Sequence, residues 1–286
     1  MQERDITNYH LEEQLSHSPW ISLKRFHYHQ NGMKKSWDLA ITPDSVAALL
    51  YHPEKECFLL VKQLRPAVFV RQLIELNQSE HVISSEISSS STTPSSLSET
   101  TISPISATST SITTTTELIP PKAKLSLELC AGLLDKHGKS PIETMQAEIL
   151  EECGYHVPLG MIEPITSYYS GAAKSYSIQH LYYVEMRQVL DQKDEEQQQS
   201  CIFDPLNGEF CKKVSNGGGL EEEGEMIEVV ELPLSQAKEL MKDESVVRSP
   251  SLLHALSWWF LEKATPEQVE KHYRRSVVSS SLSSMN

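Results

Sequence analysis

The sequence predicts an α/β protein: an α/β/α sandwich around a mixed sheet, with an antiparallel hairpin extension at its N-terminal side. Three observations lead to this fold class. Apolar segments of strand length alternate along the chain with segments of helical periodicity. A two-residue turn signal joins two strand-like segments near the N-terminus. One segment, 140–154, carries the signals of an amphipathic helix from its N-cap to its final glycine.

The first expected elements are a hairpin and a second strand pair. Segments 21–29 and 33–41 flank Gln30-Asn31-Gly32, and Asn-Gly is a strong signal for a two-residue hairpin turn. Apolar runs at 45–51 and 57–63 flank a turn-like segment and are typical of strands. We therefore expect residues 1–43 to form a hairpin extension and the main domain to begin at residue 44.

The composition changes sharply between residues 84 and 116, where Ser and Thr dominate. Such a segment cannot bury enough apolar surface to offset the entropy cost of ordering it. We expect a disordered insertion at about 78–120, placed between strands where a long loop adds little entropy cost. A mucin-like stalk is the alternative, but it requires secretion, and residues 1–14 show no signal sequence.

The best-defined element is the helix at 140–153. Ser140 is a good N-cap, Pro141 suits the first helical position, and Glu143 completes a capping box. Gly154 follows where a helix commonly ends. The helix has an apolar face, which we expect to lie opposite its glutamates and which consists of Ile142, Met145, Ile149 and Cys153.

Three carboxylates, those of Glu148, Glu151 and Glu152, lie one turn apart on this helix. Their like charges repel one another, and a bound divalent cation removes that conflict because Mg²⁺ prefers oxygen ligands. A solvated acidic face on an ordinary amphipathic helix is the alternative. The spacing therefore indicates a candidate metal site and, through the metal, phosphate chemistry.

The second half of the chain continues the alternation of strands and helices. A polar loop is expected at about 190–218, and a disordered tail at 266–286 after a main domain that spans 44–265. A short helix at 235–242 and a helix that starts at Pro250 are expected near the end. The expected strands lie at 125–131, 162–169, 179–185 and 226–232.

Composition limits the classes of partner. The 286 residues carry a formal net charge of −14, which argues against a nucleic-acid partner because phosphate backbones select basic surfaces. The five cysteines lack C-x-x-C spacing, which favours buried or free thiols in a reducing compartment. No apolar run reaches membrane-spanning length. We expect a cytoplasmic protein without a membrane partner.

Residues 132–155 resemble the Nudix box, a signature of a hydrolase family. Glu148, the pair Glu151 and Glu152, and Gly154 match its later positions. The opening glycine, Gly132, lies one residue too far upstream. Two further departures are Gly138 in place of the early glutamate and Ala147 in place of the arginine that orients the first carboxylate.

Other segments are similar to the uridine diphosphate glucose pyrophosphatase branch of this family, which is close to the ADP-ribose pyrophosphatases. These segments are 29–50, 59–69, 127–135, 167–171 and 217–234. The resemblance implies a Nudix-type sandwich, a homodimer built with the N-terminal hairpin, and Mg²⁺ as cofactor with Mn²⁺ as an alternative. It implies hydrolysis of UDP-glucose to UMP and glucose 1-phosphate.

The resemblance also implies roles for individual residues. The metal ligands would be Glu148, Glu151, Glu152, Glu225 and the carbonyl of Ala131, and the catalytic residues would be Glu223 and Glu151. The alternative for the acidic run at 221–225 is a solvated loop. Substrate binding would involve Arg65, Trp37, Gly132 and Lys174.

Two of these substrate-binding roles have open alternatives. Arg65 could grip phosphate in a bidentate manner or form a surface salt bridge. Trp37 could stack on a base across a dimer interface or pack within the sheet. Two other functions also stay open: hydrolysis of ADP-ribose or ADP-sugars, and binding of nucleotide sugars without cleavage.

Overall fold

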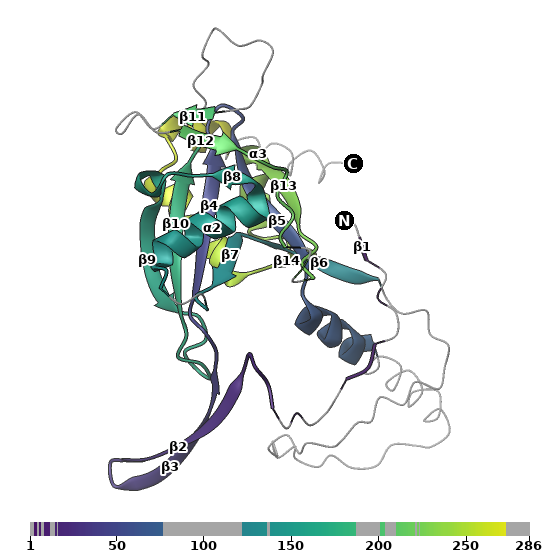
Figure 1. Cartoon of the computed structure of the whole chain (residues 1–286), viewed down its shortest axis with the longest axis vertical. Coiled ribbons are helices and arrows are strands. Elements are labelled where there is room, and N and C mark those ends of the chain that lie inside the picture. Colours follow the sequence, from purple (N-terminus) through teal and green to yellow (C-terminus); the bar gives the residue numbers. More distant parts are fainter. Residues whose placement is uncertain are drawn as a thin grey trace, which may run out of the picture. The chain divides into compact units, whose positions relative to one another are not determined.

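The computed structural model describes residues 3–4, 6, 9–11, 15, 17–76, 122–135, 138–186, 201–203, 210–220, 222 and 224–272. They belong to two compact units, residues 1–10 with 65–124 and residues 11–64 with 125–286. The second unit contains most of the labelled elements of Figure 1. The expected insertion at 78–120 lies outside the described residues.

A mixed sheet forms the centre of the second unit. Strand β4 lies between antiparallel β5 and parallel β10, and β10 continues to antiparallel β9. Strand β5 also pairs with β6 and β13, while β4 pairs with β7. These strands are β4 (Ser45–His52), β5 (Cys57–Leu64), β6 (Ala123–Glu128), β7 (Cys130–Leu133), β9 (Glu163–Tyr169), β10 (Ile178–Glu185), β13 (Glu228–Pro233) and β14 (Val247–Arg248).

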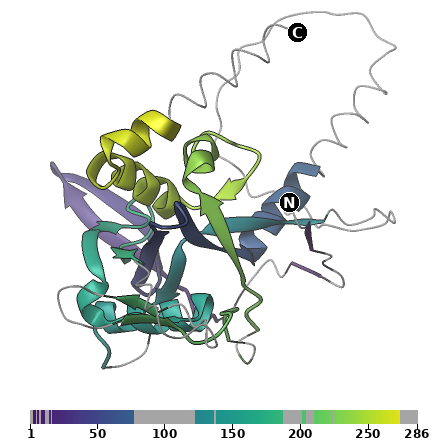
Figure 2. The ribbon, with the colours of Figure 1, turned by 90° about the horizontal axis from the view of Figure 1, so that it is seen from above.

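Helices cover both faces of this sheet, as Figure 2 shows in a view from above. Helix α2 (Pro141–Cys153) packs on one face, and α3 (Leu234–Leu240) and α4 (Pro250–Glu262) pack on the other. Burial on both faces explains why β4 is apolar at successive positions rather than at alternate ones. The predicted α/β/α sandwich is confirmed.

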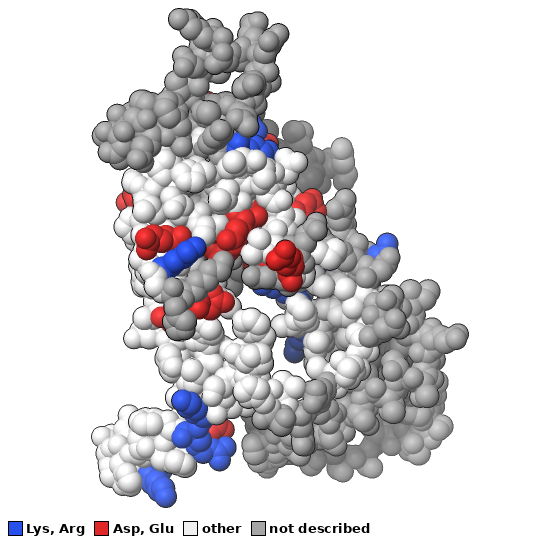
Figure 3. Space-filling model, viewed as in Figure 1, with Lys and Arg blue, Asp and Glu red and all other residues white. Residues whose placement is uncertain are grey.

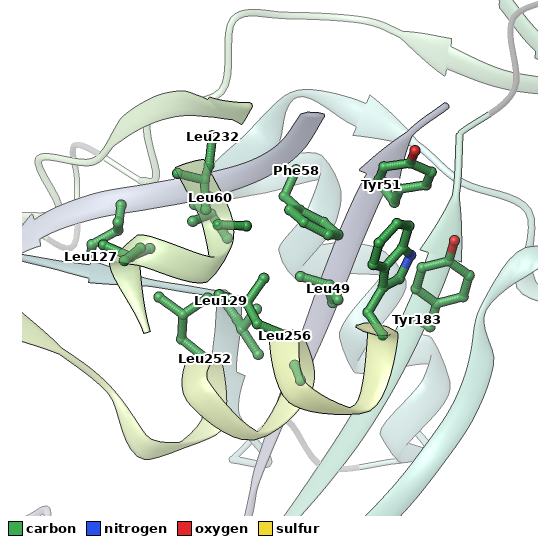
Figure 4. Packing of buried hydrophobic residues seen from close by; sticks show 14 of the residues in the cluster. Leu49, Tyr51, Phe58, Leu60, Leu127, Leu129, Tyr183, Leu232, Leu252 and Leu256 are labelled. Atoms are coloured by element: carbon green, nitrogen blue, oxygen red, sulfur yellow. The ribbon is translucent and has the colours of Figure 1, made fainter. Parts of the chain in front are cut away.

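The core on the α4 side is the more aromatic one. Trp259 is 1% exposed and lies 4.7 Å from the ring of Tyr51 and 5.1 Å from that of Phe58, measured between centroids. Leucines from the sheet and from α4 fill the rest of this layer (Figure 4). Trp259 of the C-terminal helix therefore serves packing.

The N-terminal hairpin is confirmed as β2 (Ser22–Gln30) and β3 (Met33–Ile41) around Asn31-Gly32. It forms a separate two-stranded sheet and does not extend the main one. Its turn residues have φ values of 53° and 76°, as a two-residue hairpin turn requires. A backbone bond from Ala40 N to Lys174 O, 2.8 Å long, ties its base to the β9–β10 loop.

Two expected irregular segments contain regular structure. The expected polar loop at about 190–218 includes β11 (Cys201–Phe203) and β12 (Phe210–Lys213), which pair with each other and with β8 (Tyr155–His156). The expected tail begins inside a helix, because residues 266–272 are helical. There Lys271 Nζ lies 2.6 Å from Glu56 Oε2. Residues 273–286 lie outside the described part.

The first unit contains a helix that the sequence analysis did not predict. Residues 66–76 are helical, and the carbonyl of Arg65 accepts bonds from the first turn. Phe69 is buried and contacts the ring of Tyr9 edge-on, with 5.4 Å between centroids. A short strand, β1 (Glu3–Arg4), pairs with Lys124 and Ala123.

Candidate active site

The predicted caps fix both ends of α2. Ser140 Oγ accepts a bond from Glu143 N, and Glu143 Oε2 accepts one from Ser140 N at 2.8 Å. Gly154 ends the helix with φ of 77°. A helix held at both ends presents its side chains in fixed directions, which is what a cluster of site residues on one helix requires.

The sequence analysis placed Glu152 opposite the apolar side of the helix and left a solvated acidic face as the alternative, but Glu152 is 2% exposed. Strand β7 covers it: Ala131 N donates to Glu152 Oε2 at 2.9 Å, and the Cys130 thiol also hydrogen-bonds to this carboxyl group. Helical periodicity could not reveal the burial of Glu152, because the strand that covers it, β7, is a different segment of the chain.

Burial raises the pKa of Glu152 to about 8. Burial is the largest cause of this value; the nearby carboxylates of Glu148 and Glu225 act in the same direction, and the bonds from Cys130 and Ala131 act against it. A carboxyl group with so high a pKa keeps its proton near neutral pH, and a bound cation would favour its charged form instead.

Figure 3 shows acidic side chains gathered on the molecular face that carries α2.

Glu148 lies against the backbone of β7. A Cβ atom built on Gly132 would collide with the Glu148 carboxyl group, so only glycine allows this approach. The contact places Gly132, the opening glycine of the predicted motif, beside Glu148. It also positions Glu148 although Ala147 replaces the arginine that is usual in the family.

The segment after β12 packs on the C-terminal end of α2. Gly218 N donates to Glu152 O at 2.9 Å, and Gly219 N donates to Glu151 O at 3.2 Å. The same segment leads to Glu225, whose Oε2 accepts a bond from Leu220 N at 2.9 Å. Glu225 is therefore brought to Glu152 by backbone contacts with the end of the helix.

The donor set suits a hard cation. Carboxylate oxygens of Glu148, Glu152 and Glu225 and the nearby carbonyl of Ala131 are the oxygen ligands that Mg²⁺ takes in proteins. In the described part of the chain, no three His, Cys, Asp or Glu side chains are already gathered in the arrangement of an ion site. The predicted catalytic Glu223 lies outside the described residues.

Trp37 does not pack within the sheet but is 46% exposed on the hairpin. Its Nε1 donates to Ala173 O at 2.8 Å, and Lys174 Nζ lies 4.8 Å from the ring centroid. The ring also lines a hollow of about 360 Å³ together with Phe26, Tyr28 and Leu39. Two predicted substrate-binding residues, Trp37 and Lys174, are thus adjacent.

Comparison with curated proteins gives clear relatives. The uridine diphosphate glucose pyrophosphatase NUDT14 of Bos taurus is 33% identical over 243 residues, which cover 85% of this chain and 89% of the relative. The chain belongs to the Nudix hydrolase family. The protein of the same name from Mus musculus is 29% identical over 245 residues, 86% of this chain and 90% of its own.

A third relative of this Nudix hydrolase is more distant. The GDP-mannose pyrophosphatase of Pectobacterium atrosepticum is 30% identical over 138 residues, 47% of this chain and 57% of the relative. No protein-family model matches the chain.

The remaining predicted residues of this Nudix hydrolase fall in different places. Glu151 is half-buried on α2, next to Glu152. Arg65 is exposed and belongs to the first unit, so its phosphate-binding role stays a prediction. Within the described residues, no helix combines the length and the apolar character needed to cross a bilayer.

One part of the site was not used in the sequence analysis. The sequence analysis gave the glycines at 217–219 no role, yet they allow a loop to lie directly on the end of α2. Their φ values lie between 70° and 124°, a range that favours glycine. The run of glycines in the sequence could therefore have indicated such a close approach.

Proposed function

We propose that the chain hydrolyses the diphosphate linkage of nucleoside diphosphate sugars in the presence of Mg²⁺. UDP-glucose is the preferred substrate, and UMP and glucose 1-phosphate are the products. The observation that carries the proposal is the buried carboxyl group of Glu152, with a pKa raised to about 8 beside Glu148 and Glu225. The names of the relatives support a nucleotide sugar as substrate.

In this proposal Glu148, Glu152 and Glu225 hold the metal, with Glu151 and the carbonyl of Ala131 as further ligands. A bound Mg²⁺ ion neutralises diphosphate charge and lowers the pKa of water. The backbone amide of Ala131 fixes one oxygen of Glu152, which leaves the other to face the ion. Mn²⁺ is the alternative cation.

Proton removal from the attacking water falls to Glu223, with Glu151 as the second catalytic residue. Glu223 stands two positions before Glu225 in the sequence, and the contacts of 217–219 with α2 bring Glu225 to Glu152. Arg65 would hold a phosphate oxygen pair, because its planar guanidinium group matches that geometry.

The hollow on the hairpin suits the base of the nucleotide. Trp37 and Phe26 offer aromatic faces on which a planar base can stack, and Lys174 adds a positive charge over the ring of Trp37. Exposure of this apolar face also supports a homodimer, in which the hairpin contacts a second copy. Sedimentation of the purified protein as a monomer would contradict the dimer.

A cytoplasmic location belongs to the same proposal. In the described residues, four cysteines are buried free thiols, which fits a reducing compartment.

A substrate panel tests the proposed function. We expect kcat/KM for UDP-glucose to exceed those for ADP-glucose, GDP-mannose and ADP-ribose, since discrimination reflects differential transition-state binding. A higher kcat/KM for ADP-ribose would make ADP-ribose the preferred substrate and leave the proposed hydrolysis of a diphosphate linkage unchanged. Tight binding of UDP-glucose in Mg²⁺ without release of UMP would indicate a nucleotide-sugar-binding protein and contradict the proposal.

A further inference from the structure

Two positions of β7 face two glutamates of α2. Gly132 lies against the carboxyl group of Glu148, and the thiol of Cys130 hydrogen-bonds to the carboxyl group of Glu152. Two positions along a strand span about 6.6 Å and four along a helix span about 6 Å, so strand and helix match in this spacing. Glycine at one position allows a carboxyl group to approach, whereas the other position presents a thiol to it.

Cys130 is completely enclosed. Its exposed fraction is 0%, and it belongs to the core on the α2 side of the sheet together with Cys153, which is 1% exposed. The two thiols also lie within hydrogen-bonding reach of each other. A carboxylate is a much stronger acceptor than a thiol sulfur, so the Cys130 thiol donates to Glu152. A thiol among apolar side chains keeps its proton and therefore stays a donor.

Glu152 is held by donors from two successive residues of β7. Ala131 N donates to Glu152 Oε2 at 2.9 Å, and Cys130 adds a side-chain donor. With one bond alone, the carboxyl group could still turn about the last bond of the side chain, whose rotation is only weakly restricted. A second donor from the same strand opposes that rotation.

We propose that Cys130 is a positioning residue whose thiol holds the Glu152 carboxylate in the orientation that binds the divalent cation. The inference rests on the proposed function, which makes Glu152 a metal ligand. Packing alone is the alternative, because a free buried cysteine commonly behaves as a small apolar side chain. The two roles differ in one respect: only the first requires a hydrogen-bond donor at position 130.

The test measures Mn²⁺ binding to the purified protein without substrate, by electron paramagnetic resonance. Cys130→Ala and Cys130→Val both remove the donor, the first by leaving space and the second by filling it. Loss of a group that orients a metal ligand weakens metal binding about 10- to 100-fold, so both variants should bind Mn²⁺ at least about tenfold more weakly than wild type. Cys130→Ser keeps a donor and should recover most of this loss. Either donor-free variant is sufficient if the other does not fold.

Cys211→Ala is the matched control. Cys211 is 0% exposed in the same core, and its Sγ lies 3.4 Å from Met161 Sδ. The control removes the same atoms as Cys130→Ala from the same layer but from a different contact, so it should keep the wild-type Mn²⁺ affinity. Melting temperatures measured without metal report separately what the loss of packing costs each variant.

The inference is overturned if the donor-free variants bind Mn²⁺ as tightly as wild type, or if Cys130→Ser loses as much affinity as they do. It is also overturned if Cys211→Ala loses the same amount. Each of these results would assign Cys130 to packing and leave the proposed function intact. Failure of wild type itself to bind Mn²⁺ would overturn the metal role of Glu152, and the proposed function and the inference would fall together.

Discussion

Gly154→Ala tests whether the joint between α2 and the following loop organises the site. Gly154 has φ of 77°, and an alanine Cβ there would collide with the backbone carbonyl of Ser215 and lie 2.7 Å from Gly217 N. Because both contacts are with backbone, no side-chain rotation can relieve them. The loop must shift away from the end of the helix.

The expected loss of stability has two parts. A left-handed conformation costs a residue with a Cβ about 1–2 kcal/mol. Displacement of the loop weakens the bonds from Val214 N to Gly154 O, 2.8 Å, and from Gly218 N to Glu152 O, 2.9 Å. At about 1 kcal/mol for each bond, the free energy of unfolding should fall by about 3–4 kcal/mol.

Gly32→Ala is the matched control. Gly32 has φ of 76°, and a Cβ built there meets nothing within 4 Å, so this variant carries the conformational cost alone, about 1–2 kcal/mol. Guanidinium denaturation gives both values. Because the loop carries Glu225 to Glu152, Gly154→Ala should also lower kcat/KM about 100-fold. Equal stability losses in the two variants, with full activity in both, would refute the reasoning.

Three further predictions concern the core, the pH dependence and the hairpin. Trp259→Ala should lower the free energy of unfolding by about 3–5 kcal/mol, because it empties the aromatic core; a loss under 1 kcal/mol would contradict this. Burial lowers the pKa of His52 although Glu54 lies 3.1 Å away, so the unfolded chain binds its proton first and stability should fall as pH drops below about 6.5. His52→Gln should flatten that slope in denaturation measured against pH, and parallel slopes would exclude His52 as the cause. Trp37→Ala should raise KM for UDP-glucose about tenfold at unchanged Mg²⁺ requirement, whereas Leu23→Ala, an exposed change at 82% exposure, should leave KM unchanged. Equal KM values in the two hairpin variants would remove Trp37 from base binding.

Most of the fold could be predicted from local signals in the sequence. The turn at Asn31-Gly32 and the caps at Ser140 and Gly154 act through neighbours in sequence, so their elements could be predicted. The short strands β8, β11 and β12 could not, because two- to four-residue segments gain their stability from pairing rather than from their own pattern.

The candidate site was predicted only in part, for the same reason. The spacing of Glu148 and Glu152 indicated a shared function, and the structure brings both to one place with Glu225. Burial of Glu152 depends on β7, and the approach of Glu148 to Gly132 depends on the pairing of β7 with β4. Such contacts between distant segments leave no periodic trace in the sequence.

Mg²⁺-dependent release of UMP from UDP-glucose, compared between wild type and Glu152→Gln, tests the central claim most directly. Glutamine keeps the shape of the side chain and removes its negative charge. We expect wild type to depend on Mg²⁺ and the variant to lose nearly all turnover while it remains folded. Equal turnover by the two proteins, or turnover by wild type that persists in excess chelator, would contradict the account.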